Sequence, residues 1–280
     1  MLDNKITCLI LSCDKFSDLW DGNVRLFNEN WRDRKFETYI VTDRHSQKLY
    51  PGVSIISAGA DVEWSDRLAI ALRRIKTQFV FITLDDYYLI KAVDSAKIEK
   101  MVDYMEQNKY DYLRLFRNPP KAKSDELVEI KGVYHVDTRY EYCVNLYAGI
   151  WDIEFLKSCI KEPMDAWHFE VSLQQRAIEY GAKCLVSLND DYIILDVVRK
   201  GKILRRANAF FQKHPDIYKG NRAVNTRWYE FTLGIKELGS KVIPTWLVPL
   251  CRKFLMLFGL KFYSTENGYG RKDSCNSTDL

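Results

Sequence analysis

The chain has 280 residues, enough for one large domain or for one domain with an appendage. Hydrophobic residues make up 47% and charged residues 29%, a globular balance that excludes disorder along most of the chain. The formal net charge of +4 is too small to indicate a nucleic-acid-binding coat. Seven Cys residues are scattered without a CxxC pair, which excludes a zinc knuckle or a disulfide scaffold. Such cysteines predict reduced thiols in a cytosolic protein.

The first third of the chain alternates predicted strands with predicted helices. Apolar residues at helical spacing predict one helix over 19–31 and another over 64–75. Short β-rich runs predict strands at 5–12, 38–42, 53–57 and 79–84. Continuous apolar strands between amphipathic helices indicate an α/β fold whose parallel sheet is covered on both faces. In such sheets, ligands bind at the carboxyl ends of the strands.

The middle of the chain is less regular. Apolar runs predict strands at 112–116 and 145–151, and the polar segment 121–141 between them predicts a hairpin or a mobile loop. A helix is expected over 153–160. A second helix should start after Pro163-Met164-Asp165 and stop near Gly181. We expect a globular domain over 1–220 and a helical segment over 221–280.

The C-terminal run 242–260 is apolar but carries two prolines and the pair Arg252-Lys253. A membrane-spanning helix needs roughly 20 mostly apolar residues without such interruptions. We therefore expect this run to lie on a membrane rather than in it, with basic residues facing anionic lipid. Those basic residues are Arg199, Lys200, Lys202, Arg205, Arg206, Arg252 and Lys253. The alternative is a helical hairpin that packs on the first domain.

Acidic residues follow three of the predicted strands. Asp14 follows the first strand, Asp43 follows the second, and Asp85-Asp86 follow the strand at 79–84. If these strands are parallel neighbours, their carboxyl ends place the four carboxylates in one crevice. Carboxylates that close repel one another unless a cation lies among them. A divalent ion that carries a diphosphate suits such a crevice, because Mg²⁺ prefers one or two carboxylates plus phosphate oxygens.

The order of these segments resembles the GT-A class of nucleotide-sugar glycosyltransferases, and more narrowly the bacterial enzymes that build O-antigen, capsule and other surface polysaccharides. The resemblance covers roughly residues 5–200, a full domain by size. It rests on these segments: Ser12-Cys13-Asp14, Thr42-Asp43, Trp64-Ser65-Asp66-Arg67, Leu84-Asp85-Asp86, Tyr147–Trp151 and Ala166–Glu170. It implies a Rossmann-like nucleotide-sugar-binding sheet flanked by helices, with a helical C-terminal appendage. Leu84 departs from the family pattern, because it stands where an acid is usual.

The resemblance implies roles on the donor side. Asp86 would bind Mn²⁺ or Mg²⁺, and Asp85 would lie nearer the ribose or bind through water, although an ordinary turn after a strand also favours Asp. Asp43 would accept the base N–H of uracil, or it is a turn residue. Ser12, Cys13 and Asp14 would line the base and ribose pocket mainly through their backbone. Arg67 would contact the diphosphate, or it is a solvated helix residue.

The resemblance also implies roles on the acceptor side. Glu170 borders an apolar helix face, and we expect Trp167 and Phe169 to desolvate it, raise its pKa and make it the general base. The alternative is an ordinary surface Glu. Asp165 is the second candidate for the base, although an N-cap is its more common role. Trp151 would stack on the acceptor sugar.

Together these features predict a metal-dependent, inverting glycosyltransferase. It would move a sugar from a UDP-sugar donor to a hydroxyl of a lipid-linked glycan, as a cytoplasmic protein bound peripherally to the inner face of the membrane. One rival is a sugar-nucleotide nucleotidyltransferase, but the segment after the first strand lacks the Gly-rich basic loop expected of one. Another rival is a catalytically silent carbohydrate- or partner-binding protein on the same scaffold.

Overall fold

A computed structural model of the chain describes residues 2–117, 123–232 and 234. The chain forms two compact units. The first joins Met1–Val197 to Arg206–Asn221, and the second joins Val198–Arg205 to the chain from Arg222 onward. The assignment of functions to 1–220 and 221–280 stays a prediction. The apolar run 242–260 lies outside the described residues.

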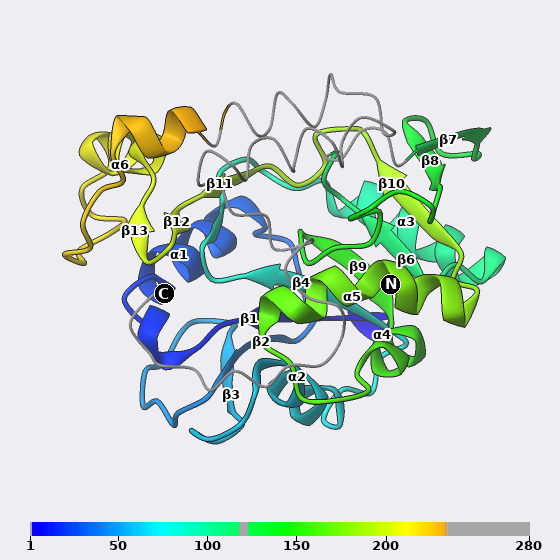
Figure 1. Ribbon diagram of the computed structural model, residues 1–280, viewed down its shortest axis with the longest axis horizontal. Helices are drawn as coiled ribbons and strands as arrows, with labels where there is room; N and C mark the ends of the chain where they lie inside the picture. Colours follow the sequence, from blue (N-terminus) through cyan, green and yellow to red (C-terminus); the bar gives the residue numbers. More distant parts are fainter. Residues whose placement is uncertain (1, 118–122, 233, 235–280) are drawn as a thin grey trace, which may run out of the picture. The chain divides into compact units, whose positions relative to one another are not determined.

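The first unit is an α/β structure built on one large mixed sheet, which confirms the predicted fold class (Figure 1). Nine of the described strands form this sheet in the order β3-β2-β1-β4-β9-β6-β10-β8-β7. Their bounds are β1 Ile6–Leu11, β2 Thr38–Thr42, β3 Ser54–Ser57, β4 Phe79–Leu84, β6 Tyr112–Arg114, β7 Lys123–Leu127, β8 Val133–Val136, β9 Gly149–Asp152 and β10 Cys184–Ser187. A separate pair joins β5 (Tyr87–Leu89) to β11 (Ile194–Asp196) in antiparallel register.

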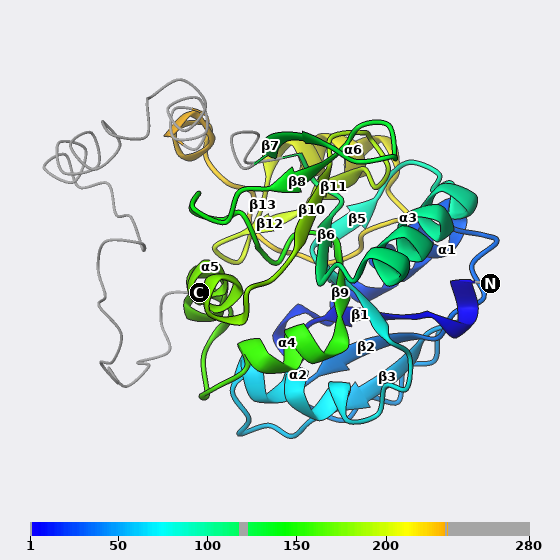
Figure 2. The ribbon, with the colours of Figure 1, turned by 90° about the vertical axis from the view of Figure 1, so that its right-hand side faces the viewer.

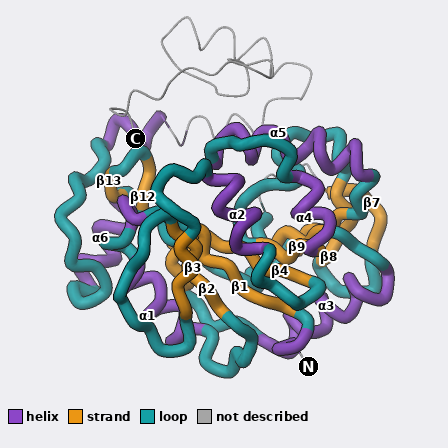
Figure 3. Tube along the Cα trace, turned by 90° about the horizontal axis from the view of Figure 1, so that it is seen from below, coloured by secondary structure: helices purple, strands orange, loops and turns teal. Residues whose placement is uncertain are grey.

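Helices cover both faces of the sheet, as predicted (Figures 2 and 3). The helices are α1 Trp20–Asn30, α2 Trp64–Leu72, α3 Ser95–Asn108, α4 Ile153–Cys159, α5 Ala166–Tyr180 and α6 Arg205–Lys213. Side chains of a strand alternate between the faces. In β1, Cys8 and Ile10 pack with α1 and α3, whereas Leu9 and Leu11 pack with α2, α4 and α5. Burial on both faces explains why this strand is continuously apolar.

The first four strands of the large sheet run parallel, as their apolar sequences indicate. β2 and β4 flank β1, and β3 extends the sheet beyond β2. β9 breaks the pattern, because it runs antiparallel between β4 and β6. The polar segment predicted at 121–141 contains the antiparallel pair β7 and β8.

Several elements, among them α3, β5, β10, β11 and α6, were not predicted from the sequence. The pattern of α3 was visible, because its buried residues Ile98, Met101, Val102 and Met105 recur at helical spacing. β5 and β10 contain only three and four residues, too few to show a reliable period. α5 was predicted with its bounds, since Asp165 caps its start and Gly181 adopts the left-handed conformation (φ +71°) at its end.

The described part of the second unit is small. β12 (Val198–Arg199) and β13 (Lys202–Ile203) form a hairpin, and Ile203 bridges Val224. Trp228 is 72% exposed. Among the described residues, no helix is both long and apolar enough to cross a membrane.

Candidate functional site

The carboxyl ends of β1, β2 and β4 meet at one edge of the sheet. β1 lies between the other two in parallel register, and the ladder extends past its end. The Ser12 N–H donates to the Val41 carbonyl (2.9 Å), and the Asp85 N–H donates to the Leu11 carbonyl (3.3 Å). The predicted meeting of acidic strand ends is therefore present, because the parallel register aligns the points at which these strands stop.

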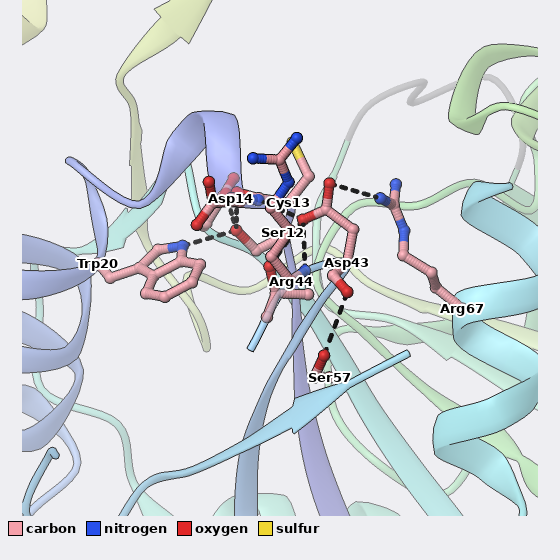
Figure 4. A network of polar contacts seen from close by, with 10 residues as sticks. Ser12, Cys13, Asp14, Trp20, Asp43, Arg44, Ser57 and Arg67 are labelled. Atoms are coloured by element: carbon pink, nitrogen blue, oxygen red, sulfur yellow. Dashed lines mark hydrogen bonds and ion pairs between the residues drawn. The ribbon is translucent and has the colours of Figure 1, made fainter. Parts of the chain in front are cut away.

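Asp43 pins the loop after β1 to the end of β2 (Figure 4). Its Oδ1 accepts hydrogen bonds from the backbone N–H of Asp14 (2.6 Å), the backbone N–H of Arg44 (3.0 Å) and the hydroxyl of Thr42 (3.1 Å). Burial alone would raise the pKa of Asp43, but these hydrogen bonds outweigh it and hold the pKa below its usual value. Asp43 is therefore an ionised carboxylate with one oxygen committed to the loop.

The other oxygen of Asp43 faces Arg67. Arg67 projects from α2, and its Nη1 lies 3.7 Å from Asp43 Oδ2. The Arg67 side chain is only 14% exposed, and its Nε has no hydrogen-bond partner among the described residues. A partly buried guanidinium with an unused donor is suited to an anionic ligand. Its position excludes the alternative of a solvated helix residue.

Ser12 joins the end of β1 to the end of β4. Its hydroxyl donates to the carboxylate of Asp85, and it accepts a hydrogen bond from the indole N–H of Trp20 (2.6 Å). Asp85 is only 6% exposed. Burial, followed by the charge of Asp85, raises the pKa of the neighbouring Cys13 thiol to about 11, so Cys13 is not a thiolate nucleophile at neutral pH.

Asp86 follows Asp85 and is half-buried. Its carbonyl accepts the Val197 N–H (2.9 Å), which ties this position to the segment after β11. In the described part of the chain, no group of three or more His, Cys, Asp or Glu residues could hold a metal by itself. A single carboxylate fits the different arrangement in which Mg²⁺ or Mn²⁺ takes most of its oxygen ligands from phosphate and water.

Glu170 lies on α5 and contacts the loop before β9. Its Oε1 accepts the backbone N–H of Leu146 (3.1 Å). The loop is held in turn by Tyr112, whose hydroxyl donates to the Asn145 carbonyl (3.1 Å), and by Arg114, which donates to the Cys143 carbonyl (3.2 Å). The hydrogen bond from Leu146 therefore fixes the Glu170 carboxylate against the loop before β9.

The two aromatic residues expected to shield Glu170 differ in their surroundings. Phe169 is fully buried in the core, where it packs on Trp64 at 5.2 Å between ring centroids. Trp167 is 48% exposed. Phe169 therefore does not shield Glu170, because residues adjacent on a helix point in different directions, whereas Trp167 stands three positions before Glu170, on the same side of α5.

Asp165 is the N-cap of α5. Its Oδ1 accepts the backbone N–H groups of Trp167 and His168, both at 2.9 Å, and its Oδ2 lies 2.6 Å from His168 Nδ1. Both carboxylate oxygens therefore have local partners at the helix start. This geometry is that of a structural cap, the more common of the two roles considered for this residue.

Trp151 lies in the protein core rather than at a surface where a sugar could bind. Its side chain is fully buried on the face covered by α2, α4 and α5, and it packs on Tyr112 at 4.4 Å between ring centroids. No face of this indole is open to a ligand, so the prediction that it stacks on an acceptor sugar is wrong. The alternation of a strand sends the Ile150 side chain to one face and Trp151 to the other, and helices cover both faces.

A different aromatic group lies between the two halves of the candidate site. The ring of Tyr147 stacks on Tyr87 at 5.5 Å and on Phe116 at 4.3 Å. Tyr87 directly follows Asp86, and Tyr147 directly follows Leu146, the partner of Glu170. The stack therefore connects the segment of the proposed metal ligand with the segment that orients the proposed base. Sequence signals at Tyr147 were no stronger than at Trp151.

No protein-family model and no curated protein matches the chain. Among solved structures, the chain is similar to the mannosyltransferase PcManGT from Pyrobaculum calidifontis in complex with GDP-Man and Mn²⁺. The identity is 12%, the match covers 91% of this chain and 75% of that one, and the TM-score is 0.49. It is also similar to S. aureus TarS 1-349 in complex with UDP-GlcNAc, with 14% identity, coverage of 71% and 60%, and a TM-score of 0.48.

A third similar structure is the bifunctional IspDF from Campylobacter jejuni, with 12% identity, coverage of 69% and 52%, and a TM-score of 0.41. The chain spans 36% of the length of S. aureus TarS and 59% of TarS 1-349. Because every one of these TM-scores is below 0.5, the likenesses establish neither a shared fold nor a shared function.

Proposed function

We propose that the chain is an inverting glycosyltransferase that uses a nucleotide-sugar donor, with UDP as the nucleotide. The observation that carries the proposal is the junction at the carboxyl ends of three parallel strands, where Asp43 bonds the Asp14 N–H and Ser12 bonds Asp85. This edge is where α/β sheets bind nucleotides. It combines a hydrogen-bond acceptor, a guanidinium and a half-buried carboxylate within three neighbouring segments.

Different residues would bind different parts of the nucleotide-sugar donor. Oδ2 of Asp43 accepts the base N–H, while its Oδ1 holds the loop of Asp14; the turn role and the uracil-binding role of Asp43 are thus compatible. The loop Ser12–Asp14 borders the base and ribose. Because the Arg67 guanidinium lies 3.7 Å from Asp43 Oδ2, it would contact the donor beside the base that Asp43 binds, rather than at the diphosphate on the far side of the ribose.

Asp86 would hold a Mn²⁺ or Mg²⁺ ion, with Asp85 behind it on Ser12. When bound, the ion supplies positive charge that stabilises the leaving nucleoside diphosphate. Glu170 takes the proton of the acceptor hydroxyl as the hydroxyl oxygen forms its bond to the anomeric carbon. The bond from that carbon to the diphosphate oxygen breaks, and the electron pair leaves with the diphosphate.

The acceptor in this proposal is a lipid-linked glycan of surface polysaccharide biosynthesis, reached from the cytoplasmic face of the membrane. Its support is the sequence of 242–260, where apolar residues alternate with prolines and a basic pair. Trp167, which is 48% exposed and lies three residues before Glu170 on α5, would be the sugar-stacking residue in place of the buried Trp151.

Calorimetric titration of UDP with and without Mn²⁺ tests the donor site directly. The wild-type protein should bind UDP more tightly with Mn²⁺, and Asp86→Ala should remove this gain while leaving the fold intact, because it relieves repulsion between carboxylates. Asp103→Ala is the matched control, since Asp103 pairs with Lys5 before the start of β1, at the opposite edge of the sheet.

A wild-type protein with no metal-dependent nucleotide affinity would favour the silent binding protein instead. If the protein does bind UDP, a screen of nucleotide sugars for slow hydrolysis without an acceptor would identify the sugar that it transfers. Near-normal transfer by Asp86→Ala in Mn²⁺ would show that the ion is not held by this motif.

A further inference from the structure

The turn between β4 and β5 carries Asp85 and Asp86. Three of the four backbone carbonyls from 84 to 87 accept hydrogen bonds from α1. The side-chain amide of Asn23, on α1, donates to the carbonyls of Leu84 (3.3 Å), Asp85 (3.0 Å) and Tyr87 (3.2 Å). The remaining carbonyl of the turn, that of Asp86, accepts the Val197 N–H (2.9 Å). Every carbonyl from 84 to 87 therefore has a donor.

The first turn of α1 is fitted closely to this segment. Asn23 is only 3% exposed. A Cβ built on the adjacent Gly22 would collide first with the Ile217 carbonyl oxygen and would also lie 2.8 Å from the Tyr88 hydroxyl oxygen, closer than packed atoms approach. The same hydroxyl donates to the Leu19 carbonyl (2.8 Å), and Trp20 donates to Ser12, the partner of Asp85. A larger residue at position 22 would push the helix away from the turn.

An asparagine is needed here for a physical reason. Buried carbonyls must find donors, because no water reaches them. A side-chain amide carries two N–H protons that three closely spaced carbonyls can share, whereas a carboxylate has none and an apolar residue leaves the carbonyls unpaired. Asparagine also has a poor intrinsic helix propensity, so local preference gives no reason for it at this position.

We propose that Asn23 is a positioning residue for the metal–diphosphate site, because its amide fixes the turn from which the Asp86 carboxylate projects. This inference rests on the proposed function of Asp86. Groups that orient a ligand in this way typically contribute 10- to 100-fold to metal affinity, taken as about that order. Asn23 touches no substrate in this proposal, and it acts only through the backbone of residues 84–87.

The test compares Asn23→Asp with a matched variant on the same helix. Asn30 also uses its side-chain amide on a backbone carbonyl of this segment, since it donates to the Leu89 carbonyl (3.0 Å) at the far end of β5. Asn30→Asp thus removes an equivalent amide–carbonyl hydrogen bond between α1 and β5, at a point away from Asp86. Both variants should lower the melting temperature, which reports the structural role alone.

The deciding readout is Mn²⁺ affinity in the presence of UDP, measured by calorimetry on the full chain. Asn23→Asp should weaken it at least about tenfold, with metal-free UDP affinity unchanged, and Asn30→Asp should leave both affinities unchanged. Asn23→Ser, which keeps one donor, should give an intermediate loss and serves if Asn23→Asp does not fold. Equal Mn²⁺ losses in the Asn23 and Asn30 variants, or none in the Asn23 variants, would overturn the inference.

A measurement on the wild-type protein needs no variant. The side-chain amide protons of Asn23 should exchange slowly with solvent by NMR, and rapid exchange would contradict the contacts on which the inference depends. If the wild-type protein binds UDP with no dependence on Mn²⁺, the proposed function fails and this inference fails with it. If metal dependence is present and only the Asn23 result is negative, the inference alone is overturned.

Discussion

Asp43 gives its two carboxylate oxygens different partners. Oδ1 accepts three local hydrogen bonds that shape the loop after β1, whereas Oδ2 lies near the Arg67 guanidinium. The side chain is 19% exposed, so the carboxylate is shielded but reachable. Asp43 thus stabilises the loop with one oxygen and presents the other as an acceptor to a ligand. It combines the turn role and the base-binding role, which the sequence alone leaves as alternatives.

The lowered pKa of Asp43 predicts how its contribution to stability depends on pH. The folded state holds the proton less tightly than the unfolded state, whose pKa is about 3.9. The stabilisation is therefore complete above that value and is lost as pH falls through the folded pKa. Thermal unfolding of wild type and Asp43→Asn from pH 7 to pH 3 should show a difference that shrinks below about pH 4. A difference that stays constant over this range would contradict the ionised Asp43.

Glu170 is tested by a substitution that keeps its shape. In Glu170→Gln the side chain can still accept the Leu146 N–H, but it cannot take a proton from an acceptor hydroxyl. We expect kcat to fall by about 10² or more, with nucleotide affinity unchanged.

The control for Glu170→Gln is Glu179→Gln, on the same helix. Glu179 pairs with Lys161 and is 40% exposed, so its substitution should leave kcat unchanged. A Glu170→Gln protein that loses only donor affinity would remove Glu170 from the role of base, and Asp165→Asn would then be measured.

At the scale of elements, the start of α5 carries a carboxylate with a structural role. Asp165 caps α5 and Asp94 caps α3 in the same way, through side-chain acceptance of backbone N–H groups. Asp165→Ala and Asp94→Ala should each cost about 1 kcal/mol of unfolding free energy, which lowers the melting temperature by roughly 2–4 °C. Both variants should retain turnover. A loss of kcat in Asp165→Ala alone would assign the base to Asp165.

The sheet and its helices explain where the candidate site lies. β1, β2 and β4 are buried on both faces, so their backbones are held rigidly and their ends differ little in position. Polar residues appear at the end of each strand, because at that point the chain emerges from between the hydrophobic clusters on the two faces of the sheet. The proposed donor-side carboxylates thus follow strand ends, whereas Arg67 lies on α2 and Glu170 on α5, both on the opposite face of the sheet from α1.

At the scale of the whole molecule, the proposal predicts that the chain associates with a membrane surface. The run 242–260 would bury broken backbone bonds and two charges if it spanned a bilayer. If it lies flat, its apolar residues enter the interface while Arg252 and Lys253 meet lipid headgroups, each worth about 1 kcal/mol. The full chain should therefore sediment with anionic liposomes, and high salt should weaken this binding.

Truncation after Asn221 provides the comparison. It should reduce liposome binding and spare UDP binding, since the donor residues all lie before Glu170. A full chain that ignores anionic liposomes at low salt would favour a packed helical hairpin and would remove the main support for a lipid-linked acceptor.

Local signals in the sequence were sufficient for the donor half of the site. An apolar run followed directly by an acid marks both a buried strand and its end, and this pattern alone predicts that Asp14, Asp43 and Asp85 lie at one edge of the sheet. Asp165 and Gly181 likewise mark the limits of α5, because caps act within a few residues of the helix. Such features depend on neighbours in the chain, so they can be recognised without knowing the fold.

Contacts between distant segments were decided only by the tertiary structure. The family resemblance implied that Trp151 stacks on a sugar, but the helices α2, α4 and α5 bury it on their face of the sheet. Asn23 looked like a polar residue on an amphipathic helix, yet its amide bonds the turn 62 residues later in the chain. Which side chain meets which backbone across such distances is set by how helices and strands pack. Periodicity determines the face on which a residue lies, and packing determines what that face meets.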